Sequence, residues 1–236
     1  MATYTALTTR IKASAAINPS DSDFDAHWPA ILLDAETRIY RDLDPLVARK
    51  YATTTFGASA PANAVLAQPA DCIVIRGLHY FTPAGSQTNR FTIEERDEEF
   101  VKDYWPARGL TGLPKYFCKL GHNQVLVAPS PNGTYTVEMP YTYRPPTLSS
   151  ASPGDGTQTT VLSTVYEDLL FAAAMVGVAG YKKNYGASAD DPREGVTWEI
   201  QYQARLAAAR DEEMSRKAGS RADESPSQAS ERNPVD

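Results

Sequence analysis

The feature that most constrains the fold of this chain is a strand-rich block, residues 112–148, which lies between two stretches of helical sequence. The block opens on Gly112 and Pro114 and contains short runs in which apolar and polar residues alternate, as in strands with one buried face. The predicted strands are residues 116–120, 124–128 and 134–143. Residues 129–133 include Asn132-Gly133 and are expected to join the last two strands as a hairpin. A strand-rich block inside a helical frame predicts an α+β fold.

Two short helices are expected before this block. Residues 4–16 hold Leu7 and Ile11 at helical spacing, and turn-forming residues end the pattern. A second helix is predicted over residues 29–43, because proline is tolerated in a first helical turn and apolar residues then recur at steps of three and four. From residue 51 onward β-branched and aromatic residues replace this periodicity. Further strands are predicted at residues 72–75 and 91–93, followed by a short acidic helical turn at 94–101.

Two more helices are expected after the block. The third begins with a predicted capping box of Thr164 and Glu167, in which each side chain satisfies a backbone N–H of the other. The fourth begins near Asp191, with proline following as the first helical residue, and is expected to end near Met214.

These patterns predict a helical bundle built from both ends of the chain, with an antiparallel β-rich domain inserted into it. The expected divisions are N-terminal helices at 1–50, the β-rich domain at 51–150, C-terminal helices at 151–215 and an extended tail at 216–236. The tail contains four basic and four acidic residues and almost nothing to bury.

Charge and hydropathy limit the classes of partner. The net charge of −6 and the pI near 5.2 argue against a protein whose main task is to grip nucleic-acid phosphates, yet an acidic surface would let DNA pass without adhering. The longest apolar run, residues 169–179, is shorter than the roughly 20 residues of a membrane span. The N-terminus has no signal-peptide pattern, and Cys72 and Cys118 are interpreted as buried thiols of a protein made in the cytoplasm.

Motifs that carry chemistry are missing from the sequence. His27, His79 and His122 are scattered without metal-ligand spacing, and the acidic run 94–99 lacks the oxygen spacing of a calcium loop. No nucleophile elbow, phosphate-binding loop or dinucleotide fingerprint occurs. A hydrolase that uses a pair of carboxylates remains an alternative, since a sequence does not show the distance between them. We expect no enzyme activity and no catalytic, cofactor-binding or metal-binding residues.

Two groups of side chains are candidates for partner contacts. Aromatic residues of the β-rich domain would form a partner or sugar-binding surface, although packing in the core is the favoured alternative. The surface is assigned to Tyr104, Trp105, Tyr141 and Tyr143, from a set that also includes Tyr116 and Tyr135. The cations of the tail would dock on an acidic partner or, alternatively, serve as solubilising charge. They are Arg216, Lys217, Arg221 and Arg232.

The order of several short patterns resembles a known family over about 210 residues. The residues that carry the resemblance in the N-terminal helices are Tyr4, Thr5, Leu7, Ile11, Trp28, Pro29, Ile31, Leu33, Ala35, Glu36, Arg38, Ile39, Arg41 and Leu43. Those in the β-rich domain and the last helix are Leu66, Pro69, Ala70, Asp71, Gly112, Pro114, Tyr116, Pro129, Pro131, Gly133, Tyr135, Trp198, Tyr202 and Leu206. In this order they resemble the podovirus-type head-to-tail adaptor, or connector, proteins of tailed bacteriophages, such as tail tubular protein A. The tail beyond Met214 is not covered.

The resemblance implies a structural virion protein at the head–tail interface. It implies a homo-oligomeric ring, commonly of twelve copies, that links the portal protein to the tail nozzle protein and lets DNA through without sequence-specific binding. The cations of the tail would then dock on the portal, and the aromatic surface would receive the nozzle. The alternative is a carbohydrate- or partner-binding β module on an oligomerising helical base.

Overall fold

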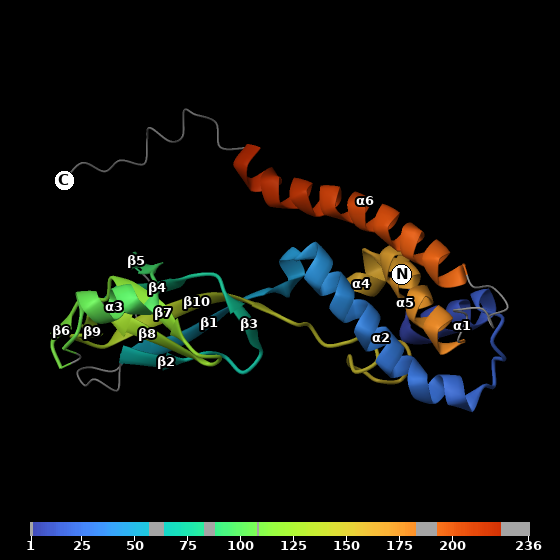
Figure 1. Ribbon diagram of the computed structural model, residues 1–236, viewed down its shortest axis with the longest axis horizontal. Helices are drawn as coiled ribbons and strands as arrows, with labels where there is room; N and C mark the ends of the chain where they lie inside the picture. The colour runs from blue at the N-terminus through green and yellow to red at the C-terminus, as the bar shows by residue number, and fades with distance from the viewer. Residues whose placement is uncertain (1, 57–63, 83–87, 108, 183–192, 223–236) are drawn as a thin grey trace. The chain divides into compact units, whose positions relative to one another are not determined.

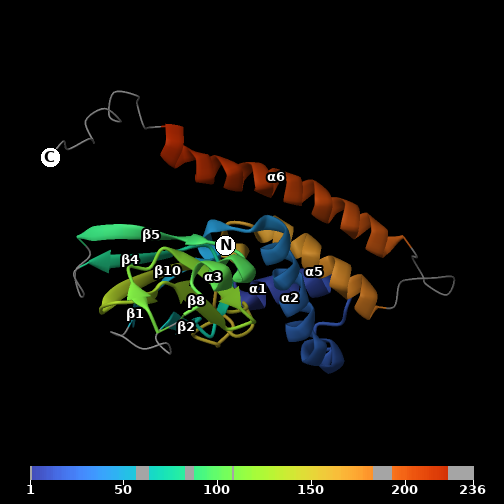
Figure 2. The same cartoon turned by 60° about the vertical axis from the view of Figure 1, so that its left-hand side comes forward.

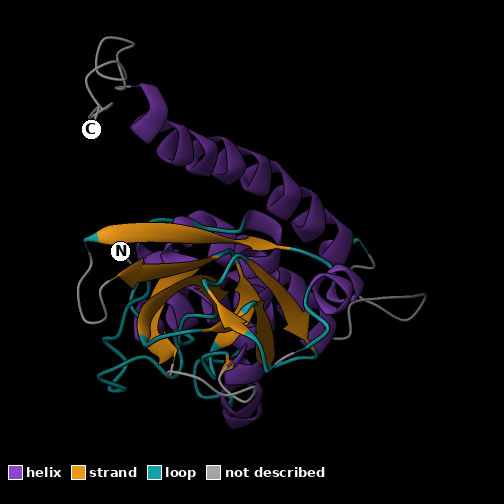
Figure 3. Ribbon diagram, turned by 90° about the vertical axis from the view of Figure 1, so that its left-hand side faces the viewer, coloured by secondary structure: helices purple, strands orange, loops and turns teal. Residues whose placement is uncertain are grey.

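The computed structural model describes residues 2–56, 64–82, 88–107, 109–182 and 193–222, with side chains described to residue 217 (Figure 1). The chain divides into two compact units. The helical unit is formed by Met1–Val47 and Pro145–Asp236, and the β unit by Ala48–Arg144. The strands belong to one unit and the long helices to the other (Figure 1), and Figure 3 colours the two kinds of element, so the predicted α+β class is confirmed. Among the described residues, no helix combines the length and the apolar character needed to cross a membrane.

Three helices that run alongside one another form the frame of the helical unit: α2, α5 and α6 (Figures 1 and 2). Their buried faces enclose one apolar core together with α1 and α4. The helices are α1 (Tyr4–Ser14), α2 (Ser22–Leu43), α4 (Val161–Thr164), α5 (Glu167–Tyr181) and α6 (Glu194–Ala222). A 3-10 turn, η1 (Leu46–Ala48), leads into the β unit.

Helix α2 begins two turns earlier than the sequence predicted. Its N-cap is Asp21, whose side chain accepts a hydrogen bond from the backbone N–H of Phe24 at 3.0 Å. Phe24 and Trp28 are buried and stacked, with ring centroids 5.7 Å apart, so the first two turns already have an apolar face. Pro29 therefore lies inside the helix on its exposed side and does not start it.

Helices α2 and α5 approach each other closely where α5 has no side chain. A Cβ added at Gly177 would lie 2.8 Å from Cγ2 of Ile31, which is closer than real Cβ atoms come to other atoms. The predicted capping box of Thr164 and Glu167 is wrong. The box is made by Thr160 and Ser163 and begins α4, while α5 starts after Tyr166 without a side-chain cap. The predicted cap of α6 at Asp191 lies outside the described residues.

The β unit is built on an eight-stranded sheet with the order β1-β10-β4-β5-β7-β8-β2, with β3 also paired to β10. The sheet is mixed and not wholly antiparallel as predicted, because β5 and β7 run parallel. Its first and last strands are partners: β1 pairs with β10 antiparallel over eight residues, from Arg49 opposite Thr142 to Phe56 opposite Tyr135. The strands are β1 (Arg49–Phe56), β2 (Val65–Ala67), β3 (Cys72–Ile75), β4 (Leu78–Thr82), β5 (Asn89–Glu95), β7 (Tyr116–Leu120), β8 (Gln124–Ala128) and β10 (Tyr135–Tyr143). A second, two-stranded sheet pairs β6 (Thr111–Gly112) with β9 (Ser130–Pro131).

The predicted hairpin between the last two strands is wrong, although the strands themselves are confirmed. Strands β8 and β10 are not neighbours in the sheet, and the segment between them carries β9. The hairpin of this region joins β7 to β8 instead, and its turn contains Gly121 at φ 64°. Glycine adopts this left-handed conformation without the steric cost that other residues meet.

The predicted acidic helical turn at 94–101 is shifted along the chain. Strand β5 continues to Glu95, because Glu94 and Glu95 pair with β7, and helix α3 (Glu98–Tyr104) begins only after Asp97. Val101 is the buried residue of α3 and packs in a small apolar cluster with Cys118, Leu126 and Ala128. This contact holds α3 against strands β7 and β8.

Candidate functional site

The C-terminal half of α6 is fastened to the helical unit by a buried carboxylate. Glu213 is 3% exposed and accepts hydrogen bonds from the Tyr166 hydroxyl, from the backbone N–H of Leu46 at 3.2 Å and from Nη1 of Arg216 at 3.3 Å. Burial and the hydrogen bond to Glu213 raise the pKa of the Tyr166 hydroxyl far above its usual value. The phenol therefore stays protonated and donates to the carboxylate.

The structure places two of the predicted docking cations in contacts within the unit. Arg216 pairs with Glu212 at 2.6 Å and also donates to the Tyr166 hydroxyl at 3.1 Å. Lys217 donates to the carbonyl oxygen of Asp44 at 2.9 Å, where α2 ends in a left-handed residue. A cation is favourable at this position, since the last carbonyl groups of a helix are otherwise unpaired.

The predicted tail thus begins later than the sequence indicated, because α6 continues past Met214 to Ala222. Arg221 lies in the last turn of α6, and Arg232 lies outside the described residues. The structure therefore separates the four predicted cations into a pair that fastens α6 and a pair at or beyond its end.

A second set of polar contacts joins α2 to the first half of α6. Arg38 makes a two-pronged pair with Glu199, with N–O distances of 2.8 and 2.5 Å, and its guanidinium lies 4.1 Å from the centroid of the Tyr202 ring. The Tyr202 hydroxyl in turn donates to Asp42 at 2.7 Å. Planar two-pronged pairing fixes orientation as well as distance. These contacts set the position of α6 along α2.

The carboxylate of Glu36 marks the point at which the chain returns from the β unit. Glu36 is 2% exposed, and its oxygens accept from the backbone N–H of Leu148 at 3.1 and 3.2 Å. Burial raises its pKa to about 7, although the hydrogen bond from Leu148 lowers it. Leu148 is itself fully buried in the core of the helical unit, so the pair fixes the returning segment.

In the β unit, α3 presents an aromatic cluster that includes half of the predicted partner surface. The rings of Phe100 and Tyr104 stack at 5.8 Å, and both meet Tyr116 edge to face. Phe100 and Tyr104 are each 42% exposed. Trp105 is next to Tyr104, and its indole N–H donates to the carbonyl oxygen of Leu110 at 2.9 Å. The neighbouring Leu110 is 62% exposed.

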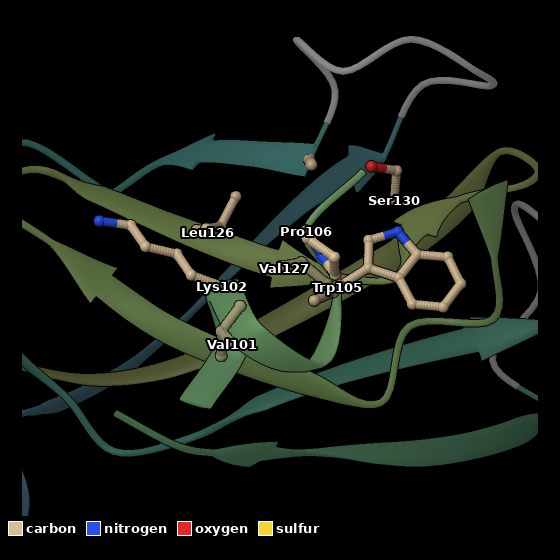
Figure 4. A pocket seen from close by; sticks show the side chains of 9 residues that line it. Val101, Lys102, Trp105, Pro106, Leu126, Val127 and Ser130 are labelled. Carbon is tan, nitrogen blue, oxygen red and sulfur yellow. The ribbon is translucent and has the colours of Figure 1, made fainter. Parts of the chain in front are cut away.

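A small pocket lies beside this cluster (Figure 4). It has a volume of about 180 Å³ and is lined mainly by apolar side chains of α3 and β8. Its lining comprises Ala64, Val101, Lys102, Trp105, Pro106, Leu126, Val127, Ala128 and Ser130. The pocket holds one apolar side chain or a few atoms of a ligand, and it carries no arrangement of acid, base and nucleophile.

The other two aromatics of the predicted surface lie on β10 and are not equally accessible. Tyr141 is 5% exposed, and its hydroxyl donates to Asp71 at 2.9 Å, so its ring is not offered to a partner in this chain. Tyr143 is half-buried beneath Lys50, whose ammonium lies 3.7 Å from the ring centroid. Lys50 also pairs with Asp71 at 3.0 Å, and the hydrogen bonds from Lys50 and Tyr141 lower the pKa of Asp71.

Within the described part of the chain, no three His, Cys, Asp or Glu side chains come together as a metal site would require. Cys72 and Cys118 are not joined in a disulfide. The sequence did not indicate the buried, hydrogen-bonded roles of Glu36 and Glu213. Their signal was a charged residue at a core position of a helix, such as Glu36 four residues after Leu32 and three before Ile39.

One family model matches nearly the whole chain. The family model described as "SU10 adaptor protein" matches residues 2–226. No curated protein matches the sequence. A solved structure titled "Neck of empty GTA particle computed with C6 symmetry" is similar at 12% identity, covering 82% of this chain and 87% of that chain, with a TM-score of 0.26.

Proposed function

The chain belongs to the SU10 adaptor protein family, whose members are structural phage head-to-tail adaptors and not enzymes, and we propose that it forms a ring between portal and nozzle. The match over residues 2–226 shows the family and confirms the resemblance to adaptor proteins that the sequence indicated, and membership of this family supports the proposed ring. The ring would contain twelve copies, would be made in the host cytoplasm and would become part of the virion.

The two units differ in net charge, and this difference supports a separate role for each of them in the ring. The helical unit contains 21 acidic and 13 basic residues, a formal charge of −8, whereas the β unit contains 8 and 10, a formal charge of +2. An acidic wall repels the phosphates of a passing duplex, and many copies in a ring would add their fields. We therefore assign the surface that faces DNA to the helical unit, with no sequence-specific contact.

The β unit is proposed to receive the nozzle protein through the α3 cluster. Phe100 and Tyr104 expose apolar rings held in place by Tyr116, and Leu110 adds a further exposed apolar side chain. Rigid aromatic side chains are enriched at protein interfaces, because they bury a large area at a small cost in conformational entropy. Tyr143 remains a candidate at the rim of β10, whereas Tyr141 would contribute through its support of Asp71.

Portal docking is proposed for the segment that follows the fastened part of α6. Arg216 and Lys217 hold α6 in the helical unit, so Arg221 and Arg232 are the better candidates for contact with an acidic portal surface. A chain segment that becomes ordered on assembly can wrap a large surface.

Removing residues 221–236, which include Arg221 and Arg232, separates docking from folding. We expect the shortened chain to keep its helical content and thermal stability, since all the described contacts of Glu213, Arg216 and Lys217 remain, and to lose portal binding. The measurement is pull-down on purified portal protein together with circular dichroism. The double variant Arg216→Ala, Lys217→Ala is the matched comparison. It should lower the thermal stability of the chain, which the truncation should not. Undiminished portal binding by the shortened chain would remove the segment from the docking role.

The adaptor function itself is tested by electron microscopy of the purified chain, alone and mixed with the portal protein of the same phage. A ring of added density below the portal is the expected result. A chain that stays monomeric and leaves the portal unchanged would contradict the proposal and favour the alternative of a β-rich binding module on a helical base.

A further inference from the structure

An apolar groove runs along the surface between α5 and α6. It has a volume of about 400 Å³ and is lined by Val176, Ala179 and Gly180 of α5 and by Gly195, Val196, Glu199 and Ile200 of α6. Val196 and Ile200 are 61% and 64% exposed, which is unusual for branched apolar side chains that lie so close together. Small residues on the α5 side leave room for a side chain to enter.

The face of α6 that continues from the groove is poor in exposed charge over about four turns, because the partly exposed Glu199 and Arg205 are engaged with Arg38 and with the carbonyl oxygen of Asp168. Between Arg193 and Arg210, every largely exposed residue is uncharged. These residues are Val196, Thr197, Ile200, Gln203, Ala204, Ala207 and Ala208. In a chain with 22% charged residues, a solvent-facing helix surface normally carries several charges. Depletion of charge is a mark of the centre of a protein interface.

A complementary projection lies on α2. Leu33 is 42% exposed, and its exposed helical neighbours Ala26 and Ala30 are small, so its side chain stands out from the helix. Asp42, through which α2 contacts α6, follows Leu33 by nine residues, or two and a half turns at about 3.6 residues per turn. Ile31, which faces α5, lies about 200° around the helix from Leu33. Leu33 therefore points away from α5 and α6, and the groove and the projection lie on opposite flanks of the helical unit.

We propose that the α5–α6 groove of one copy receives Leu33 and the outer face of α2 from a second copy of this chain. This inference rests on the proposed ring and names the surfaces that would close it. Charge is balanced beside the groove, because Lys182 pairs with Glu194 at 3.2 Å, so the pairing rests on the apolar fit and on the positions of the two surfaces.

Opposite flanks make the contact head-to-tail. Each copy uses its groove on one neighbour and its projection on the other, and a contact between unlike surfaces continues until a rotation closes it into a ring. A contact of like with like, groove against groove, would stop at two copies. If the groove bound the portal protein instead, Leu33 on the opposite flank of the same chain would have no partner surface.

The test uses sedimentation velocity on the full chain, with and without portal protein. Leu33→Asp removes the projection, and Ile200→Asp or Val196→Asp fills the groove with charge. Each variant alone is expected to weaken self-association about a hundredfold, as loss of a central apolar contact does at other interfaces. Ser215→Asp is the matched control, because it adds the same charge at an exposed position of α6 that lies outside both the groove and the uncharged face.

A mixture of two variants gives the decisive result. The Leu33→Asp chain retains an intact groove and the Ile200→Asp chain an intact projection, so an equal mixture should form a two-chain complex and nothing larger. A mixture that stays monomeric, or single variants that assemble like the unmodified chain, would overturn the pairing while leaving the adaptor function in place. Failure of the unmodified chain to associate even on the portal would overturn both.

Discussion

At the scale of single residues, two buried carboxylates do most to tie distant segments together. Glu36 holds Leu148, 112 residues away in sequence, and Glu213 holds Tyr166 and Leu46. Buried acidic side chains are costly unless hydrogen bonds compensate for lost water. Glu213 has three donors, whereas the described partner of Glu36 is a single backbone N–H, which leaves Glu36 the more sensitive to pH.

We expect stability to fall as pH rises through the range set by Glu36. Its pKa is about 7 in the folded chain and about 4.3 in an unfolded chain, so the folded state binds the proton more tightly. The stabilising effect of the protonated form is complete below pH about 4 and is lost as pH rises through 7. Glu36→Gln keeps an acceptor for Leu148 without the charge, and should be more stable than the original chain at pH 8 by about 2–3 kcal/mol.

The measurement is denaturant unfolding between pH 4.5 and pH 8, comparing Glu36→Gln with the unmodified chain. The difference between the two should be small at the acidic end and widen steadily toward pH 8. A constant difference across the range would show that folding does not raise the pKa of Glu36.

The hydroxyl of Tyr166 should contribute to the stability of the chain in addition to the packing of its ring. Tyr166→Phe leaves the buried Glu213 without one of its donors, and an unsatisfied buried acceptor costs about 1–3 kcal/mol. Thermal unfolding measures the loss. Tyr181→Phe is the control, because no described hydrogen bond involves the Tyr181 hydroxyl although its ring also packs at the edge of the core. Equal effects of the two substitutions would contradict the role of the hydroxyl.

At the scale of elements, the closeness of α2 and α5 depends on one glycine. Gly177→Ala would place its Cβ against Ile31, so we expect a net loss of about 1–3 kcal/mol despite the better helix propensity of alanine. Gly180→Ala, one turn further on, meets no atom within 4 Å and should be neutral or stabilising. Differential scanning calorimetry of both variants tests the contact, and a Gly177→Ala chain as stable as Gly180→Ala would refute it.

Elements with a clear period could be predicted from the sequence, and their ends and partners could not. The spacing of Trp198, Tyr202 and Leu206 indicated α6, and alternation indicated β7, β8 and β10. The start of α2 was missed because Pro29 was interpreted as a helix start, although Asp21 supplies the cap. Strand pairing was missed because Asn132-Gly133 indicates a hairpin locally, while β10 finds β1 and β4 through long-range contacts.

The candidate surfaces show the same division. Aromatic type identified Tyr104 and Trp105, yet the sequence did not show that Tyr141 is buried or that Arg216 and Lys217 are used within the chain. Exposure depends on tertiary packing, which residue type alone does not determine. The α5–α6 groove was missed for this reason. Val196 and Ile200 are of residue types that are usually buried, although both are exposed here.

At the scale of the whole molecule, the β unit is an insertion whose two ends meet. Arg49 and Thr142 are opposite each other in the pairing of β1 with β10, and such partners have Cα atoms about 4.5–5.5 Å apart. The helical unit has its own apolar core, made entirely of residues outside 48–144. Each unit therefore contains what it needs to fold.

Joining Arg49 to Thr142 through a two-residue Asn-Gly turn should leave the helical unit folded. We expect the shortened chain to show helical circular dichroism and a cooperative thermal transition, because the Glu36, Glu199 and Glu213 contacts are all retained. The separate fragment 48–144 is the companion sample and should show a strand spectrum. A shortened chain that melts without cooperativity would mean that the β unit stabilises the frame.

The closed pairing of β1 with β10 also bears on how such a gene can change. Recombination could exchange the whole β unit for another module. The new module would need only two chain ends as close together as Arg49 and Thr142, whatever its size. The surface that the β unit presents could then diversify by replacement of one module, while the core of the helical unit was inherited unchanged.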